Sequence, residues 1–111
     1  MTPFLFQRKQ RIVRKKDFDA IYSSGNRCTV GPLLILSKPN NVKQTRLGLS
    51  VPKRVGNAVI RNLIKRKCRE AFRISQHRLP KETDILITAR PHTPLSTETY
   101  VDLIEQGVSG D

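Results

Sequence analysis

The densest group of side chains that can bind an anion lies between Gly48 and Arg73. This stretch carries eight of the 21 basic residues of the chain and a single acid, Glu70. Arginine can donate two parallel hydrogen bonds to a phosphate group, and lysine acts on it as a point charge. The composition of the stretch therefore favours the binding of a polyanion. Its basic residues are Lys53, Arg54, Arg61, Lys65, Arg66, Lys67, Arg69 and Arg73.

The spacing within this stretch predicts an amphipathic helix. Apolar residues recur at intervals of three and four, at Ile60, Leu63, Ile64, Cys68, Ala71 and Phe72. Four cations recur every fourth residue, and we expect them on the opposite side, at Arg61, Lys65, Arg69 and Arg73. Residues four apart rise about 6 Å along a helix, which is comparable to the spacing of neighbouring phosphates. A solvated surface helix is the alternative, but such helices usually mix both signs of charge.

Residues for bond-breaking chemistry are not clustered in the sequence. The nine carboxylates are scattered, no Cys or His pair has metal-ligand spacing, and Gly48 and Gly56 do not form a glycine-rich phosphate loop. His77 and His92 fall in predicted loops or helix ends. We therefore predict no catalytic residues and no metal site in the protein, and we expect a partner to carry any reaction.

The charge of the chain is divided between its two ends. Residues 1–81 hold 20 basic and 3 acidic residues, whereas residues 82–111 hold 1 basic and 6 acidic residues. A basic field of this kind favours nucleic acid as partner and an anionic membrane as the second possibility. Residues from Arg11 onward are candidates to join the same surface.

The length of 111 residues predicts one domain, 1–111, of which about the first ten residues form a flexible basic tail. No apolar run approaches the roughly 18 residues of a membrane span, and the N-terminal charge order is the reverse of a signal peptide. We expect a cytoplasmic protein with reduced thiols. Cys68 is expected in the core, and Cys28 has no evident role.

The remaining pattern predicts an α+β fold. Asp17 as N-cap and Gly25 as C-terminal stop bound a short helix, in which Phe18 and Tyr22 are read as core or, alternatively, as stacking platforms for bases. Strands are predicted after Gly25-Asn26, and a last helix is predicted after Ser96. The strands include the segments 33–36, 46–51 and 84–90. Helices should cover mainly one face of the sheet, and the open face is either a binding surface for an extended ligand or merely solvated.

The run from Lys53 to Glu70, KRVGNAVIRNLIKRKCRE, resembles the signature of the bacterial ribonuclease P protein subunit. The resemblance extends to Asp17-Phe18, to Leu47–Val51 and to Ala89-Arg90-Pro91. It implies a helix, three strands, a helix, a strand and a helix, with a four-stranded sheet and a left-handed crossover.

The resemblance also implies a function. In this family an RNA subunit uses Mg²⁺ to remove the 5′ leader from precursor tRNA, and the protein binds that RNA and the leader. The leader-binding residues would be Phe18, Tyr22 and Arg90. The residues facing the RNA subunit would be Lys53, Arg54, Asn57, Arg61, Asn62, Lys65, Arg66 and Arg69.

Four residues depart from the family pattern. Leu63 replaces a frequent cation and is expected to pack, and Lys67 lies on the apolar side, where it must extend past the edge of the core. Leu36 and Cys28 stand at or near positions where an aromatic residue is common. The alternative function is a structural RNA-binding or ribosome-assembly protein, and a protein nuclease and a membrane binder are weaker rivals.

Overall fold

The computed structural model describes residues 11–12, 14–40, 42 and 44–108. The expected flexible tail lies outside these residues. The described chain forms three α-helices, four strands and two short 3-10 turns. In chain order they are α1 (Lys15–Ser24), β1 (Asn26–Val30), β2 (Leu33–Pro39), β3 (Arg46–Ser50), η2 (Lys53–Val55), α2 (Ala58–Ser75), η3 (Gln76–Arg78), β4 (Thr83–Ala89) and α3 (Thr97–Val108).

The four strands form one mixed sheet in the order β1-β2-β4-β3. β1 and β4 both pair antiparallel with β2, whereas β3 and β4 pair parallel. A parallel pair needs a crossover connection, and α2 provides it between β3 and β4. The α+β class and the predicted element order are thus confirmed, while the hand of the crossover remains an expectation.

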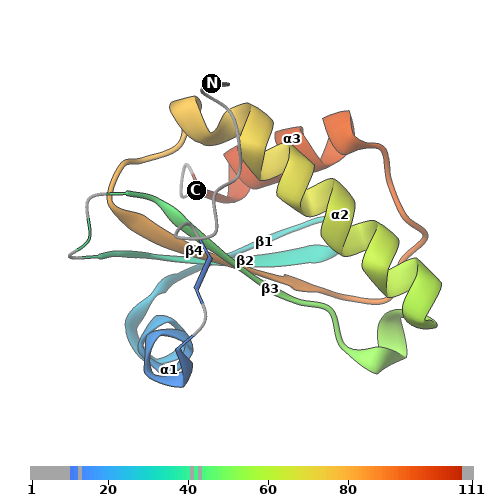
Figure 1. Ribbon diagram of the computed structural model, residues 1–111, viewed down its shortest axis with the longest axis horizontal. Helices are drawn as coiled ribbons and strands as arrows, with labels where there is room; N and C mark the ends of the chain where they lie inside the picture. The colour runs from blue at the N-terminus through green and yellow to red at the C-terminus, as the bar shows by residue number, and fades with distance from the viewer. Residues whose placement is uncertain (1–10, 13, 41, 43, 109–111) are drawn as a thin grey trace.

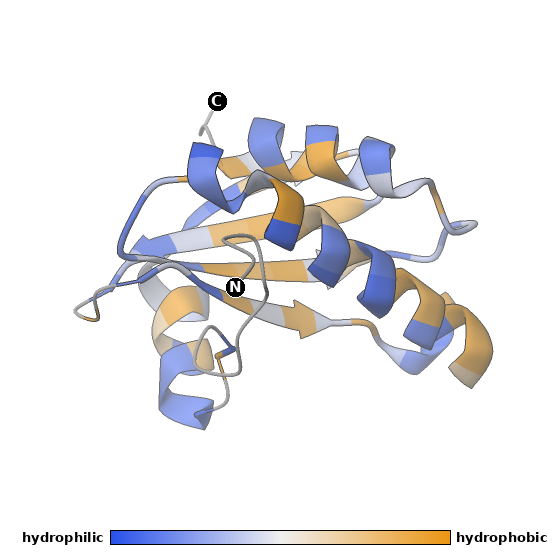
Figure 2. Cartoon of the chain, turned by 45° about the horizontal axis from the view of Figure 1, so that its top comes forward, coloured by the Kyte–Doolittle hydropathy of each residue, from blue (hydrophilic) through white to orange (hydrophobic). Residues whose placement is uncertain are grey.

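α2 and α3 pack on one face of the sheet, and α1 lies on the other face (Figure 1). The larger core lies under α2 and α3, where Ile64 and Phe72 are fully buried against Ile35 and Ile87. Cys68 is 1% exposed within this core, which confirms its expected place. The strands are hydrophobic beneath the largely hydrophilic outer sides of these two helices (Figure 2).

A second, smaller apolar cluster lies between α1 and the opposite face of the sheet. It consists of Ile12, Ile21, Leu36 and Leu86, with Phe18 and Leu34 packed beside it. Leu36 is 0% exposed, so it does not offer a surface on which a base could stack. Two of the three helices share one face, as predicted, but α1 covers part of the face that the sequence left open.

The helix ends follow from local hydrogen bonding, with one difference from the prediction. α1 begins at Lys15, after Arg14, so Asp17 is not its N-cap but a residue of its first turn. There the Asp17 carboxylate lies 3.6 Å from the guanidinium of Arg46, a contact that the sequence did not indicate. Gly25 ends α1 as predicted, since its N–H donates to the carbonyl of Ile21. Ser96 caps α3 as predicted, because its Oγ accepts from the N–H of Thr99 at 3.1 Å.

Candidate nucleic-acid interface

The cations of α2 lie on one flank and on the outer side of this helix. Asn62 and Arg66 are exposed, whereas Arg61, Lys65 and Arg69 are half-buried. The buried stripe includes Ala71, Phe72 and Ser75 besides Ile64 and Cys68, and this breadth brings Arg61, Lys65 and Arg69 to the edge of the core. These three predicted residues therefore share one side of α2, next to the sheet rather than opposite to it.

The start of α2 is fixed by residues that the family signature assigns to RNA binding. The Oδ1 atom of Asn57 accepts from the N–H of Ile60 at 2.9 Å, which makes Asn57 the N-cap. The guanidinium of Arg61 donates through Nε to the carbonyl of Gly56 at 3.1 Å. Lys53 and Arg54 are exposed in η2, directly before this cap. Cap and cations thus form one basic corner of the molecule.

A groove of about 150 Å³ runs between α1, β3 and α2, and we call it the α1–α2 groove. Lys65 and Arg69 of α2 line it together with Phe18 of α1. Burial, and secondly the positive charge of Arg11, lower the pKa of Arg69 from its ordinary value. Cations brought together in this way favour an anionic ligand, which would relieve their repulsion. The full lining is Arg11, Ile12, Phe18, Leu47, Gly48, Leu49, Lys65 and Arg69.

Gly48 allows the ring of Phe18 to lie directly on the sheet. A Cβ atom at this position would stand 2.9 Å from Cε1 of Phe18, which is closer than carbon atoms normally approach. The ring is half-buried, so one part packs on the small cluster and the rest borders the groove. Phe18 thus packs beside the core, as the sequence pattern favoured, and it also lines the α1–α2 groove.

The part of the sheet that α1 does not cover lies beside this ring. The strand register aligns Thr29, Leu34, Thr88 and Ser50 in one row across all four strands. The row lies next to the one that contains Gly48, Leu86 and Leu36. The Oγ1 atom of Thr88 is buried and has no hydrogen-bond partner among the described residues. Thr29 is exposed, Leu34, Thr88 and Ser50 are half-buried, and the row adjoins the row of Gly48, which lines the α1–α2 groove.

The structure unites only one of the three predicted leader-binding residues with the cations of α2. Phe18 lines the α1–α2 groove, but Tyr22 and Arg90 do not. Tyr22 is 41% exposed, so the core assignment that its spacing favoured is wrong. Helical spacing places it one turn from Phe18 but cannot show how much of its side chain the rest of the fold covers. Arg90 is exposed just after β4, where its N–H donates to the carbonyl of Pro32.

The four departures from the family pattern have structural explanations of different strength. Lys67 extends past the core as expected, and its Nζ donates to the carbonyl of Leu95 at 2.8 Å. Leu63 is half-buried on α2. Leu36 is buried under α1, as described above, and Cys28 is half-buried on β1, opposite Ile35. Nothing in the structure gives the Cys28 thiol a role.

Sequence reasoning missed an ionic network at the end of the sheet. The guanidinium of Arg46 donates two hydrogen bonds to the carboxylate of Asp84, at 2.8 and 2.7 Å, and Asn40 donates a third at 2.8 Å. The bond to Asp84 raises the pKa of Arg46. These partners are about 40 residues apart in the chain, so no local pattern could have found them. Glu70 and Arg73 also pair, and their spacing of three residues was a usable signal.

The described residues also bear on metal binding and on membrane insertion. Among residues 11–12, 14–40, 42 and 44–108, no group of three or more His, Cys, Asp or Glu side chains is placed to hold a metal ion. Within the same part of the chain, no helix has both the length and the apolar character required to cross a membrane.

Comparisons with known proteins agree on one family. The family model described as Ribonuclease P matches residues 6–107. The chain is 33% identical to the "Ribonuclease P protein component" of Photobacterium profundum over 96% of this chain and 91% of the relative. It is 34% identical to the protein of the same name from Syntrophus aciditrophicus, over 96% of this chain and 87% of the relative.

Solved structures of this family have the same fold. A mutant of the Staphylococcus aureus RNase P protein, described as defective in mRNA degradation activity, matches with a TM-score of 0.81 and 31% identity, over 91% of this chain and 86% of that one. The RNase P protein of Thermotoga maritima matches with a TM-score of 0.77 and 27% identity, over 86% of this chain and 92% of that one.

Proposed function

The chain belongs to the bacterial ribonuclease P protein family, and from this premise we propose that it binds a catalytic RNA and helps it to remove the 5′ leader of precursor tRNA. In this proposal the RNA subunit hydrolyses the phosphodiester bond. The protein contributes binding and orientation, and no side chain of its own takes part in the bond cleavage. The proposed site of action is the cytoplasm.

The observation that carries the proposal is the convergence of Phe18, Lys65 and Arg69 on the α1–α2 groove. An aromatic ring can stack on a base of any sequence, and cations beside it can bind the phosphates on either side of that base. The adjoining row of Thr29, Leu34, Thr88 and Ser50 would accommodate the next nucleotides of an extended strand. Such a surface suits the leader, because a general tRNA processor has to accept leaders of many sequences.

The outer side of α2 and the basic corner before it would contact the RNA subunit. The corner contributes Lys53 and Arg54, which are exposed next to the capped start of the helix. Asn62 and Arg66 continue this surface along α2. The same helix would therefore hold the leader on its inner flank and the catalytic RNA on its outer side.

Mg²⁺ enters the proposal only through the RNA. The described residues of the protein do not provide the grouped oxygen ligands that Mg²⁺ prefers. The chain's own contribution is positive charge, which offsets the repulsion between the phosphates of two RNA molecules. We therefore expect the protein to lower the Mg²⁺ concentration that the RNA needs for cleavage.

A cleavage assay tests the proposal. Precursor tRNA is incubated with a bacterial ribonuclease P RNA at low Mg²⁺, with and without this protein. The expected result is a clear gain in cleavage at the 5′ end of the mature tRNA when the protein is present. RNA binding without any gain in cleavage would instead favour a structural RNA-binding protein, and cleavage by the protein alone would favour a protein nuclease.

A further inference from the structure

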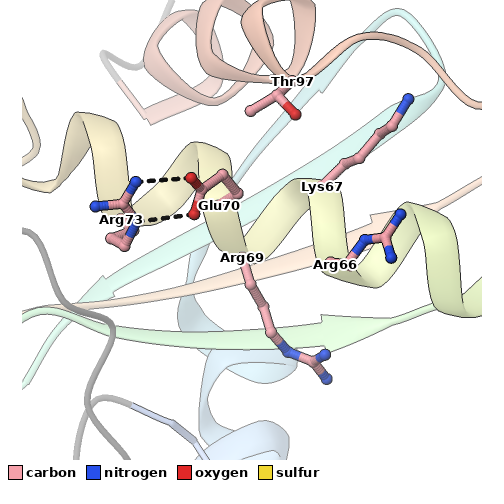
Figure 3. Close-up of a pocket in the computed structure, with 6 residues that line it drawn as sticks. All are labelled: Arg66, Lys67, Arg69, Glu70, Arg73 and Thr97. Atoms are coloured by element: carbon pink, nitrogen blue, oxygen red, sulfur yellow. Dashed lines mark hydrogen bonds and ion pairs between the residues drawn. The ribbon is translucent and has the colours of Figure 1, made fainter.

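A second basic groove lies on the other side of α2, where this helix faces the start of α3. We call it the α2–α3 groove; its volume is about 480 Å³. The family signature assigns two of its residues, Arg66 and Arg69, to the RNA subunit, but it gives no role to Glu70, Arg73 or Thr97. Its lining consists of Arg66, Lys67, Arg69, Glu70, Arg73 and Thr97 (Figure 3).

The groove contains an arginine that already holds an oxyanion. Nε and Nη2 of Arg73 donate to the two carboxylate oxygens of Glu70 at 2.8 and 2.6 Å. This side-on, two-bond arrangement is the one that a guanidinium also forms with a phosphate group. The Arg73 guanidinium lowers the pKa of Glu70, so the carboxylate is ionised at neutral pH. Glu70 thus occupies the position that a phosphate oxygen would need in order to reach Arg73.

The surroundings of this pair are basic. Figure 3 shows Arg66 and Arg73 along the groove, with Thr97 facing them from α3, while Arg69 extends to the other side of α2. Arg66 and Arg73 are seven residues apart, which is about 10 Å along a helix. That distance lies within the span of two or three successive phosphates. Glu70 is the only acid between Gly48 and Arg73 in the sequence, so its place beside Arg73 strongly affects the electrostatic potential in the groove.

We propose that the α2–α3 groove extends the RNA-binding surface of α2 beyond Arg66, and that an RNA phosphate there replaces the Glu70 carboxylate on Arg73. The proposal rests on the proposed function, because it requires an RNA partner. In the free protein Glu70 neutralises Arg73 and holds its guanidinium in the orientation for an oxyanion. On binding, a phosphodiester group takes over both hydrogen bonds and the carboxylate turns to solvent, with no covalent change.

The test compares two arginine–glutamate pairs in the same protein. Arg78 and Glu105 form a pair of the same chemistry outside this groove, with Nε to Oε2 at 2.9 Å and Nη2 to Oε2 at 2.7 Å. The variants Glu70→Gln and Arg73→Gln are therefore matched by Glu105→Gln and Arg78→Gln, which change the net charge by the same amounts. Thermal unfolding of each variant shows whether the fold is kept, and Lys65→Ala serves as the probe of the proposed function.

Affinity is measured against salt concentration for three RNAs, namely the ribonuclease P RNA, precursor tRNA and mature tRNA. For the RNA that occupies the groove, Glu70→Gln should tighten binding about twofold to fivefold, because the partly exposed carboxylate no longer competes for Arg73. Arg73→Gln should weaken binding and lower the slope of log affinity against log salt by about 0.7 to 0.9. The matched variants should change neither quantity comparably.

Each outcome decides one question. The RNA that responds to Glu70→Gln identifies the source of the phosphate. Equal effects of Glu70→Gln and Glu105→Gln, or of Arg73→Gln and Arg78→Gln, on all three RNAs would overturn the phosphate exchange at Arg73 while leaving the main proposal intact. If Lys65→Ala also left all three affinities unchanged, the proposed function itself would fail.

Discussion

The two faces of the sheet differ in how completely they are covered. On the face under α2 and α3, side chains from three strands and two helices form one continuous core. On the other face, the buried cluster among the described residues consists of Ile12, Ile21, Leu36 and Leu86, while Thr29 is exposed and Thr88 and Ser50 are half-buried. The comparison teaches that the first face supplies most of the buried core, whereas the second is the face to which our proposal assigns RNA binding.

Ile35 and Leu36 are neighbours on β2 whose side chains pack on opposite faces of the sheet. Substituting each of them tests whether the two faces contribute differently to stability. Ile35 is 1% exposed in the large core and Leu36 is 0% exposed in the small cluster. Ile35→Ala should lower the free energy of unfolding by about 4 kcal/mol, and Leu36→Ala by about 2 to 3 kcal/mol, because fewer neighbours lose contacts there. Urea unfolding of both variants measures the difference. If Leu36→Ala lowered the free energy of unfolding as much as Ile35→Ala or more, the small cluster would contribute as much to stability as the large core.

Two substitutions of Phe18 distinguish its packing against the small cluster from its proposed role in leader binding. Phe18→Ala should weaken binding of precursor tRNA about tenfold and leave that of mature tRNA nearly unchanged, because one stacked base is worth about 1 to 3 kcal/mol. Phe18→Leu serves as control, since it restores contact with the small cluster without an aromatic surface. We expect Phe18→Leu to recover stability but not leader binding. An equal loss for both RNAs would remove Phe18 from the leader site.

Lys65 tests whether the groove beside Phe18 contacts phosphate. Lys65→Ala should lower the slope of log affinity against log salt by about 0.7 to 0.9 and leave the fold intact. Lys81→Ala is a suitable control, because Lys81 is exposed before β4 and its substitution removes the same charge. Affinity measured at four or more salt concentrations gives the slopes. The same change in slope for both variants would mean that the effect reflects net charge alone.

The smallest expected effect is the pH dependence of stability that comes from Cys68. It tests whether this thiol is buried in the core under α2 and α3. Burial raises the pKa of its thiol to about 12, whereas an unfolded cysteine ionises near 8.5. Above about pH 8.5 the unfolded state therefore loses a proton that the folded state keeps, so stability falls as the pH rises. Between pH 7 and pH 9 this contribution should be below about 1 kcal/mol, and Cys68→Ala should remove it. An unchanged pH dependence in Cys68→Ala would contradict the burial of the thiol in the large core.

Much of the fold could be predicted, because its elements carry strong local patterns. The apolar spacing from Ile60 to Phe72 predicts α2, and the alternation from Arg46 onward predicts β3. The start of α1 lies three residues before the predicted one, because Asp17 is a good N-cap by type but pairs with Arg46 instead. Tyr22 was misassigned because helical spacing identifies a face of α1 and not what that face contacts.

The sequence by itself determined the distribution of charge and hydrophobicity in this protein, which is a basic stretch backed by apolar residues. Only the tertiary structure decided that Phe18 of α1 meets Lys65 and Arg69 of α2 in one groove, and that Glu70 stands in a second groove. The physical reason is the distance along the chain over which the relevant interactions act. Helical and strand periodicities arise from interactions between residues a few positions apart, whereas the placement of α1 and α2 around the sheet depends on pairings such as Gly48 with Leu86, far apart in the chain.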